Sequence, residues 1–237
     1  MNVNELTEDE LNNLFKYLST NIKTAPSNED DLKKTAHEIY CRDFNNIPRS
    51  FSKNFLNFIE KLEYLVEKRS AYTDNDKIAI ESTIDSIYTA SRAMFCESIN
   101  RTKNYTLQNC LIISGYTKEA DAINNIFKSK NIGDNVEEVD KNTFGEQFLT
   151  LGEHFYPKQS DASDLVKDIS FHDLIKIIVD KGLAHVDSLK EEEAMLIYNR
   201  HRIFLDPFIS YQLTKYIYRS HNIYESCVLD YVSKKVK

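Results

Sequence analysis

The sequence predicts an all-α protein, a helical bundle of about eight or nine helices, on three observations. Glycine and proline are scarce, with 5 and 4 residues in a chain of 237, whereas folds built on many tight turns use both often. Apolar residues recur at spacings of three and four over most of the chain, which is the period of helices that bury one face. The 14 tyrosines and 13 phenylalanines supply large side chains for the core of such a bundle.

Two short helices are expected before Pro48. Thr7 and Glu10 have the spacing of a capping box, which predicts the start of the first helix. The second is expected to end before the Asn-Asn-Ile-Pro sequence that closes at Pro48. We interpret residues 1–47 as an N-terminal helical hairpin or extension, either separable or docked on the rest, and residues 48–237 as the main bundle.

Two long helices after Pro48 give the clearest part of the pattern. The first carries an apolar stripe of Phe51, Phe55, Phe58, Ile59, Leu62, Leu65 and Val66. The second is expected to run to about Ile99, with an inward face of Ile80, Ile84, Ile87, Tyr88, Ser91 and Phe95. A short turn at residues 72–76 joins them, so we expect them to pack antiparallel.

Shorter segments complete the expected bundle. A helix from Leu107 to Ile113 is expected to be capped at Ser114-Gly115, and another is expected from Thr117 to near Lys130. Residues 131–142 are acidic and have no apolar period, which predicts an exposed loop. The Asp206-Pro207 pair is expected to separate the last two helices, because a residue before proline avoids the helical conformation.

Composition excludes several classes of function. A net charge of −7 does not fit non-specific nucleic-acid binding over the whole surface. The four cysteines are scattered, and none pairs with another cysteine or a histidine at zinc spacing. We therefore expect reduced thiols, a cytoplasmic protein, and no metal or other cofactor. No apolar run approaches the ~20 residues of a membrane span, so no membrane partner is expected. Richness in Asn, Lys and Ile favours a bacterial or phage-like genome.

Residues 170–189 combine a helix start, a long apolar run and a titratable end. Ser170 and Asp173 have the spacing of a capping box. The run from Leu174 to Val179 is apolar on most of the helix circumference, which predicts a position at the centre of the bundle. Gly182 permits the close approach of another helix or of a backbone phosphate.

The polar end of this helix holds the candidate catalytic residues Asp180, Lys181 and His185. A histidine, with an ordinary pKa of ~6.5, can act as a general acid or base at neutral pH. Lys181 lies four residues before His185, on the same helical face, and could hold an anionic group. Asp180 or Asp187 could orient the imidazole. Such a set suits phosphodiester chemistry without a metal. The alternative is that His185 caps the C-terminus of its own helix.

The pattern Asp180-Lys181-x-x-Ala184-His185-x-Asp187 resembles the end of the signature helix of HEPN-superfamily domains. The variants it resembles occur in abortive-infection and related bacterial defence proteins. The resemblance implies an all-helical bundle that forms a homodimer through the helix that carries His185. In active members it implies a metal-independent endoribonuclease, in which the histidine mediates proton transfer with the ribose 2′-hydroxyl as nucleophile.

One position departs from that family pattern. Val179 stands where the resemblance implies an arginine that steadies the scissile phosphate. Either the domain is catalytically inactive, or a cation from elsewhere substitutes. The candidates are Lys181 and the cluster Arg200-His201-Arg202, whose two arginines, Arg200 and Arg202, are also candidate substrate-binding residues for RNA phosphates. The alternative for the two arginines is a solvated helix face with intrahelical ion pairs.

Two main functions remain open from the sequence, and a third option is an unrelated phage-encoded or host helical adaptor whose resemblance to HEPN domains is accidental. The first is a dimeric HEPN-like protein of bacterial antiviral defence or of a toxin–antitoxin system, acting on RNA. The second is a non-catalytic helical interaction or regulatory protein, such as a scaffold, an adaptor or an antitoxin-like partner of another protein. The acidic net charge and Val179 favour the second, whereas the match at Asp180 to Asp187 favours a HEPN origin for either.

Overall fold

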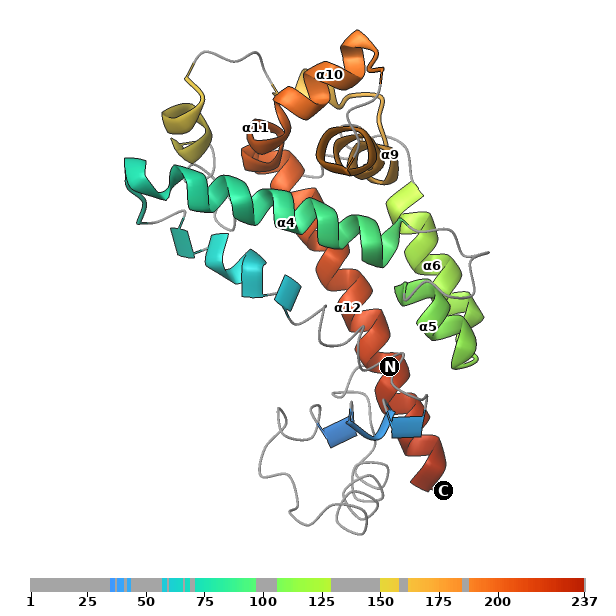
Figure 1. Ribbon diagram of the computed structural model, residues 1–237. Coiled ribbons are helices and arrows are strands. Elements are labelled where there is room, and N and C mark those ends of the chain that lie inside the picture. The colour runs from blue at the N-terminus through green and yellow to red at the C-terminus, as the bar shows by residue number, and fades with distance from the viewer. Residues whose placement is uncertain are drawn as a thin grey trace.

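The computed structural model describes residues 35, 36, 38–40, 42, 43, 57, 58, 60–65, 67, 68, 71–96, 106–128, 150–157, 162–184 and 188–236. All regular secondary structure in these residues is helical, which confirms the predicted all-α class (Figure 1). The helix predicted from Thr7, the loop predicted at 131–142, and the residues His185 and Asp187 lie outside the described residues.

Helix α4 (Lys77–Phe95) crosses the upper half of the molecule in Figure 1, and α5, α9 and α11 all pack on it. It is preceded by the short 3-10 helix η2 (Asp74–Asp76), where the Thr73 N–H and hydroxyl donate to the Asp76 carboxylate at 2.8 and 2.9 Å. The six residues predicted to face inward are all buried: Ile80, Ile84, Ile87, Tyr88, Ser91 and Phe95. The helix ends at Phe95, four residues before the predicted end.

Helices α5 (Leu107–Ile113) and α6 (Thr117–Lys128) form a tight hairpin. The Gly115 N–H donates to the Ile112 carbonyl at 3.0 Å, and the next N–H donates to the Leu111 carbonyl at 2.8 Å. These two bonds form a Schellman motif, and the φ of +90° at Gly115 explains the glycine. The predicted helix cap at this glycine is therefore confirmed.

The second half of the chain forms α8 (Ala162–Leu165), α9 (Phe171–Lys176), η3 (Ile177–Ala184), α10 (Glu191–Tyr198), α11 (Arg200–Leu205) and α12 (Pro207–Val236). Ser170 caps α9, because its hydroxyl accepts a hydrogen bond from the Asp173 N–H at 3.1 Å. The apolar helix predicted here changes form along its length, since α9 continues directly into η3, which is a π-helix. Asp206 separates α11 from α12, as predicted.

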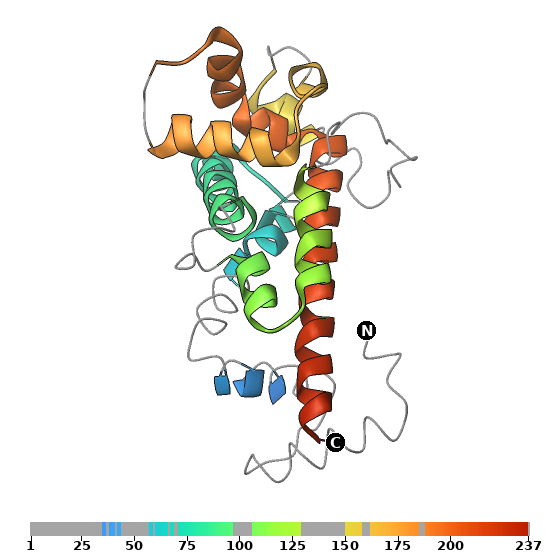
Figure 2. The same ribbon diagram turned by 90° about the vertical axis from the view of Figure 1, so that its right-hand side faces the viewer.

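Helix α12 runs along most of the described structure, and α6 lies beside it (Figure 2). Toward its C-terminus α12 also contacts Tyr40 and Asp43 of the N-terminal part of the chain. There the buried Tyr40 ring meets the rings of Tyr224 and Tyr231, with centroids 6.0 and 5.4 Å apart. These described N-terminal residues are thus docked on the bundle. No helix in the described part of the chain has the length and apolar character needed to cross a membrane.

Candidate functional site

Two of the three candidate catalytic residues lie in η3, and each contacts a different neighbouring helix. The Asp180 carboxylate accepts a hydrogen bond from Arg92 Nε of α4 at 2.8 Å. Lys181 Nζ donates to Glu193 Oε1 of α10 at 2.5 Å, and this bond lowers the pKa of Glu193. His185 lies outside the described residues. Asp180 and Lys181 therefore each have an opposite charge beside them in this chain.

The π-helical form of η3 changes the spacing argument at this site. In an α-helix, residues four apart lie on one face, whereas a π-helix bonds residues five apart. The shared face predicted for Lys181 and His185 assumed α-helical geometry, which residues 177–184 do not have. Because π-helical turns are rare and occur often at functional sites, η3 is a region where a functional role is expected.

The position at which the resemblance implies an arginine is apolar and buried, since Val179 is 7% exposed. An arginine nevertheless reaches this region, because Arg92 pairs with the adjacent Asp180 from a helix 88 residues earlier. Sequence reasoning missed Arg92. The usable signal was its place beside Ser91 at the edge of the buried stripe of α4, from which a long side chain reaches a neighbouring helix.

Gly182 lets α10 approach η3 closely. A Cβ atom at this position would lie 2.8, 3.0 and 3.3 Å from three side-chain carbons of Ile197. Of the two predicted roles for this glycine, the approach of another helix is therefore the one that the fold uses. Ile197 occupies the space beside the Gly182 backbone, so a phosphate has no access from that side.

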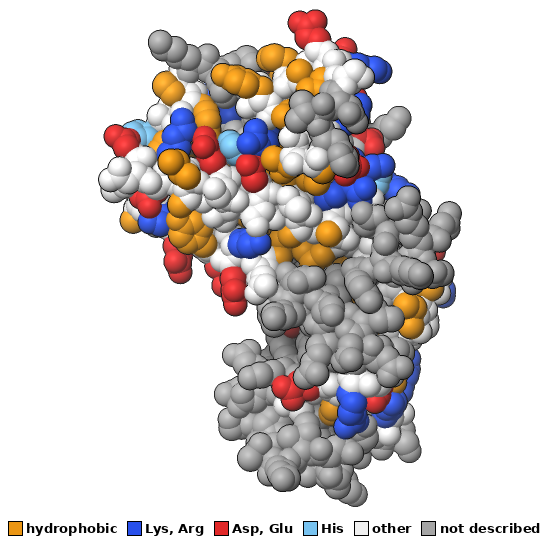
Figure 3. All heavy atoms as spheres, in the orientation of Figure 1, with side chains coloured by type: hydrophobic (Ala, Val, Ile, Leu, Met, Phe, Trp, Pro, Cys, Tyr) orange, Lys and Arg blue, Asp and Glu red, His pale blue; other side chains and the backbone are white. Residues whose placement is uncertain are grey.

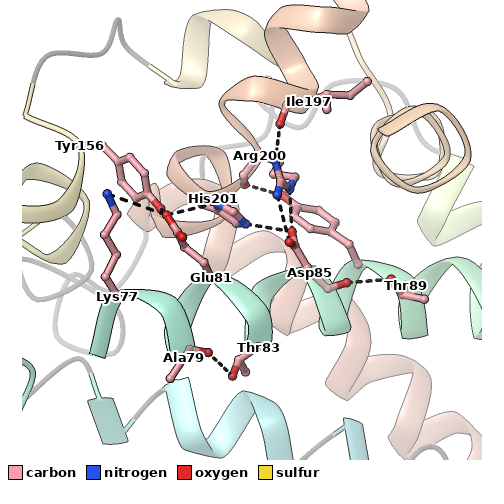
Figure 4. Close-up of polar contacts among 11 residues, drawn as sticks. Lys77, Ala79, Glu81, Thr83, Asp85, Thr89, Tyr156, Ile197, Arg200 and His201 are labelled. Carbon is pink, nitrogen blue, oxygen red and sulfur yellow. Dashed lines mark hydrogen bonds and ion pairs between the residues drawn. The ribbon is translucent and has the colours of Figure 1, made fainter. Parts of the chain in front are cut away.

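A second group of charged residues joins α4 to α11, and we call it the α4–α11 cluster: Glu81, Asp85, Tyr156, Arg200 and His201 (Figure 4). The Arg200 guanidinium donates twice to the Asp85 carboxylate, at 2.6 and 3.0 Å. It also donates to the Ile197 carbonyl at 3.1 Å. Partial burial alone would raise the pKa of Asp85, but the hydrogen bonds from His201 and Arg200 outweigh it and lower the pKa to about 2.

His201 lies between the two carboxylates of α4 and is only 8% exposed. Its Nε2 atom is 2.9 Å from Asp85 Oδ1, and its Nδ1 atom is 3.6 Å from Glu81 Oε1. The Tyr156 hydroxyl donates to the same Glu81 oxygen at 2.5 Å. Sequence analysis gave His201 no role of its own, because its acidic partners lie more than a hundred residues earlier in the chain.

Arg202 and Lys77 complete this region as caps of the helical segment 150–155. Arg202 donates to the Tyr156 carbonyl at 2.5 Å, and Lys77 donates to the Phe155 carbonyl at 3.4 Å. Cations are favourable at a helix C-terminus, where the last carbonyls have no partner within the helix. The candidate RNA contacts Arg200 and Arg202 are thus both engaged with their own chain, through a carboxylate and a carbonyl.

The α4–α11 cluster is chemically a structural junction. Its arginine neutralises Asp85, and the bond to Asp85 raises the pKa of Arg200. Burial and the bond to Glu81 raise the pKa of Tyr156, which keeps the phenol protonated and a weak nucleophile. In the described part of the chain no group of three or more His, Cys, Asp or Glu side chains could hold a metal ion.

A different kind of surface feature occurs at the end of η3 and along α10. Among the described residues, six large apolar side chains are exposed: Ile78, Ile113, Leu183, Leu189, Met195 and Tyr198. Four of them fall within residues 183–198, and we call the surface that they form the η3–α10 face. Figure 3 shows hydrophobic side chains over α10 and acidic side chains at the end of the molecule where α10 begins. This face therefore holds most of the exposed large apolar side chains among the described residues.

Comparison with known proteins places the chain beside none of them. No family model matches the sequence, no curated protein matches it, and no solved structure matches it.

Proposed function

We propose that the chain is a non-catalytic helical interaction protein, a HEPN-like bundle that acts by binding another protein through the η3–α10 face. One observation supports this most strongly: exposed apolar side chains gather on that face, while the charged candidates beside it are paired within the chain. The proposed setting, a defence or toxin–antitoxin system in the bacterial cytoplasm, rests on the resemblance of residues 180–187 to HEPN domains.

The composition of the η3–α10 face is that of an interface centre with a polar rim. Tyr198 is 72% exposed and Met195 is 42% exposed. Leaving large apolar side chains in water forgoes the favourable free energy of burying them. Tyrosine and methionine are enriched in interface centres, where a few such residues supply most of the binding energy. Ser188, Lys190 and Glu192 are exposed beside them and give a polar border. Exposed apolar side chains with such a border favour protein binding.

A second candidate function, a metal-independent endoribonuclease that works as a homodimer through the His185 helix, is favoured by Arg92. This arginine lies 2.8 Å from Asp180, next to the position where the resemblance implies an arginine. For catalysis its guanidinium must exchange the Asp180 carboxylate for a scissile phosphate, and His185 must face that phosphate. The paired state of Arg92 and Lys181 makes this the weaker of the two proposals.

An RNA-cleavage assay separates the two candidates. Wild type and His185→Ala are incubated with a mixed single-stranded RNA in EDTA, which silences contaminating metal-dependent nucleases. We expect both proteins to leave the RNA intact. Cleavage by wild type that is lost in His185→Ala would overturn the proposal and support the second candidate. Arg92→Lys then reports on phosphate contact, because lysine does not replace the bidentate grip of arginine.

A further inference from the structure

We infer that the partner of the η3–α10 face is a basic amphipathic helix of another protein, an inference that rests on the proposed function. Apolar side chains and unpaired carboxylates lie next to each other on this face. A partner that satisfies both must present apolar groups and cations at helical spacing.

The apolar part of the face presents exposed side chains at helical spacing. Met195 and Tyr198 are three residues apart, so they lie on one side of α10. Leu183 lies near the end of η3 and Leu189 lies just before α10, and both are partly exposed. Helix α10 packs directly on η3, so Leu183 lies on the helix that neighbours Met195 and Tyr198. Amphipathic helices bind such surfaces with apolar side chains at spacings of three and four.

The acidic part of the face lies in the first turn of α10. Glu191 and Glu192 are exposed, and Glu191 is four residues before Met195, on the same side of the helix. Glu193 is held by Lys181, whereas neither Glu191 nor Glu192 has an ion-pair partner among the described residues. Lys190, also exposed, offsets one of these two charges. A complementary partner therefore carries lysine or arginine beside its apolar groups.

The same charges disfavour the two other occupants considered. RNA binds through cations that neutralise its phosphates, and here the unpaired carboxylates lie beside the apolar centre while Lys181 is paired with Glu193. A second copy of this chain would bring the same carboxylates into a two-fold interface, because such an interface uses one patch on both subunits. Each copy also carries a net charge of −7, so like charges would face one another.

The test uses a fluorescein-labelled amphipathic helical peptide of leucine and lysine, with a leucine–glutamate peptide as its counterpart. Binding to the full chain is measured by fluorescence anisotropy at low and at high salt. Tyr198→Ser removes the apolar centre, and its matched control is Ile113→Ser, an exposed apolar residue on α5. Glu191→Gln with Glu192→Gln removes two charges, and its control is Asp121→Asn with Glu153→Gln, which removes two exposed charges elsewhere.

We expect Tyr198→Ser to weaken binding of the leucine–lysine peptide on the order of tenfold, as for a central interface tyrosine. The Glu191/Glu192 variant is expected to weaken it about threefold at low salt and less at high salt. Both control variants are expected to bind within about twofold of wild type, a range typical of sites outside an interface. The leucine–glutamate peptide is expected to bind weakly to every variant.

Three results would overturn the inference. Equal losses of peptide affinity in the test and control variants would mean that the peptide binds the acidic surface non-specifically, without a defined site. Self-association in sedimentation that Tyr198→Ser abolishes would make a second copy the occupant. Direct binding of a fluorescein-labelled single-stranded RNA that Tyr198→Ser weakens would make the face a nucleic-acid site. If the peptide-binding test fails and wild type does not cleave RNA, only the proposed partner is excluded. RNA cleavage that depends on His185 would exclude the proposed function itself.

Discussion

The α4–α11 cluster and the η3–α10 face meet in the sequence at Asn199, which lies between Tyr198 of the face and Arg200 of the cluster. Their side chains differ in burial and in pairing. In the cluster, Arg200 and His201 are half-buried or buried and contact carboxylates of α4. On the face, Met195 and Tyr198 extend into solvent beside Glu191 and Glu192, which have no ion-pair partner among the described residues. The charged groups of the cluster are paired within the chain, whereas the apolar side chains of the face are left exposed by the described part of the chain. We infer that the cluster serves the fold and that the face serves a partner.

The largest expected effect comes from breaking the cluster at its centre. Asp85→Ala leaves Arg200 and His201 without their shared acceptor, and both side chains are largely buried. Removing one member of such a pair leaves an uncompensated charge, so we expect a loss of about 3 kcal/mol in the free energy of unfolding. Urea unfolding measures it. Asp121→Ala, on the exposed face of α6, should change the value by less than about 0.5 kcal/mol, and an equal loss there would contradict a special role for Asp85.

A somewhat smaller effect is expected at Gly182, where η3 packs against Ile197 of α10. In Gly182→Ala the new Cβ lies within 2.8 to 3.3 Å of the Ile197 side chain, so we expect a loss of about 2 kcal/mol in the free energy of unfolding. Combined with Ile197→Ala, the loss should be smaller than the sum of the two single losses.

The matched control for this contact is Gly152→Ala, where the nearest atom to the new Cβ would lie 3.7 Å away. That distance is ordinary contact, and alanine favours the helix, so stability should stay the same or rise slightly. Strict additivity of Gly182→Ala and Ile197→Ala would show that α10 does not lie against Gly182.

Acid should weaken the cluster by about 2 kcal/mol. The pKa of Asp85 is about 2 in the folded chain and ~3.9 in an unfolded one, so its contribution is present above pH ~4 and lost as the pH falls through 2. Asp85→Asn should therefore flatten the decline of the unfolding free energy between pH 5 and pH 2. The difference curve isolates this residue from Asp76, whose pKa is also lowered. Parallel curves for wild type and Asp85→Asn would contradict the assignment.

The smallest cluster effect is expected at its edge. Arg202→Met keeps the apolar stem but removes the hydrogen bond to the Tyr156 carbonyl, for a loss of about 1 kcal/mol. Lys118→Met, at an exposed position of α6, is the control and should be neutral. If Arg202 instead serves RNA, the substitution should leave the unfolding free energy unchanged.

Sequence periodicity predicted the helices well because each is fixed by local pattern and local caps. The inward face of α4, the cap at Gly115, the cap at Ser170 and the break at Asp206 all follow from spacing within one turn or two. The change from α9 to the π-helical η3 was not predicted. Apolar spacing over so few residues does not distinguish a turn bonded at four residues from one bonded at five.

The site was harder to predict because its contacts are long-range. Asp180, Lys181, Arg200 and Arg202 were found as charged residues, but their partners come from other helices. A sequence shows a charge but not what neutralises it, and neutralisation decides whether it can hold a ligand. The partner with the largest consequence for the candidate site is Arg92, because it brings an arginine to Asp180 from 88 residues earlier in the chain.

The most direct test of the contrast is one substitution made at two tyrosines. Tyr198→Ser on the η3–α10 face and Tyr88→Ser in the core of α4 are compared by urea unfolding. Tyr198 is 72% exposed and Tyr88 is 1% exposed, and tyrosine and serine have similar helix propensities. We expect a change below about 0.5 kcal/mol in the free energy of unfolding for Tyr198→Ser and a loss of more than about 3 kcal/mol for Tyr88→Ser. A loss above about 1.5 kcal/mol for Tyr198→Ser, the scale of burying a large side chain, would contradict this expectation, because the side chain would then belong to the fold and not to a partner.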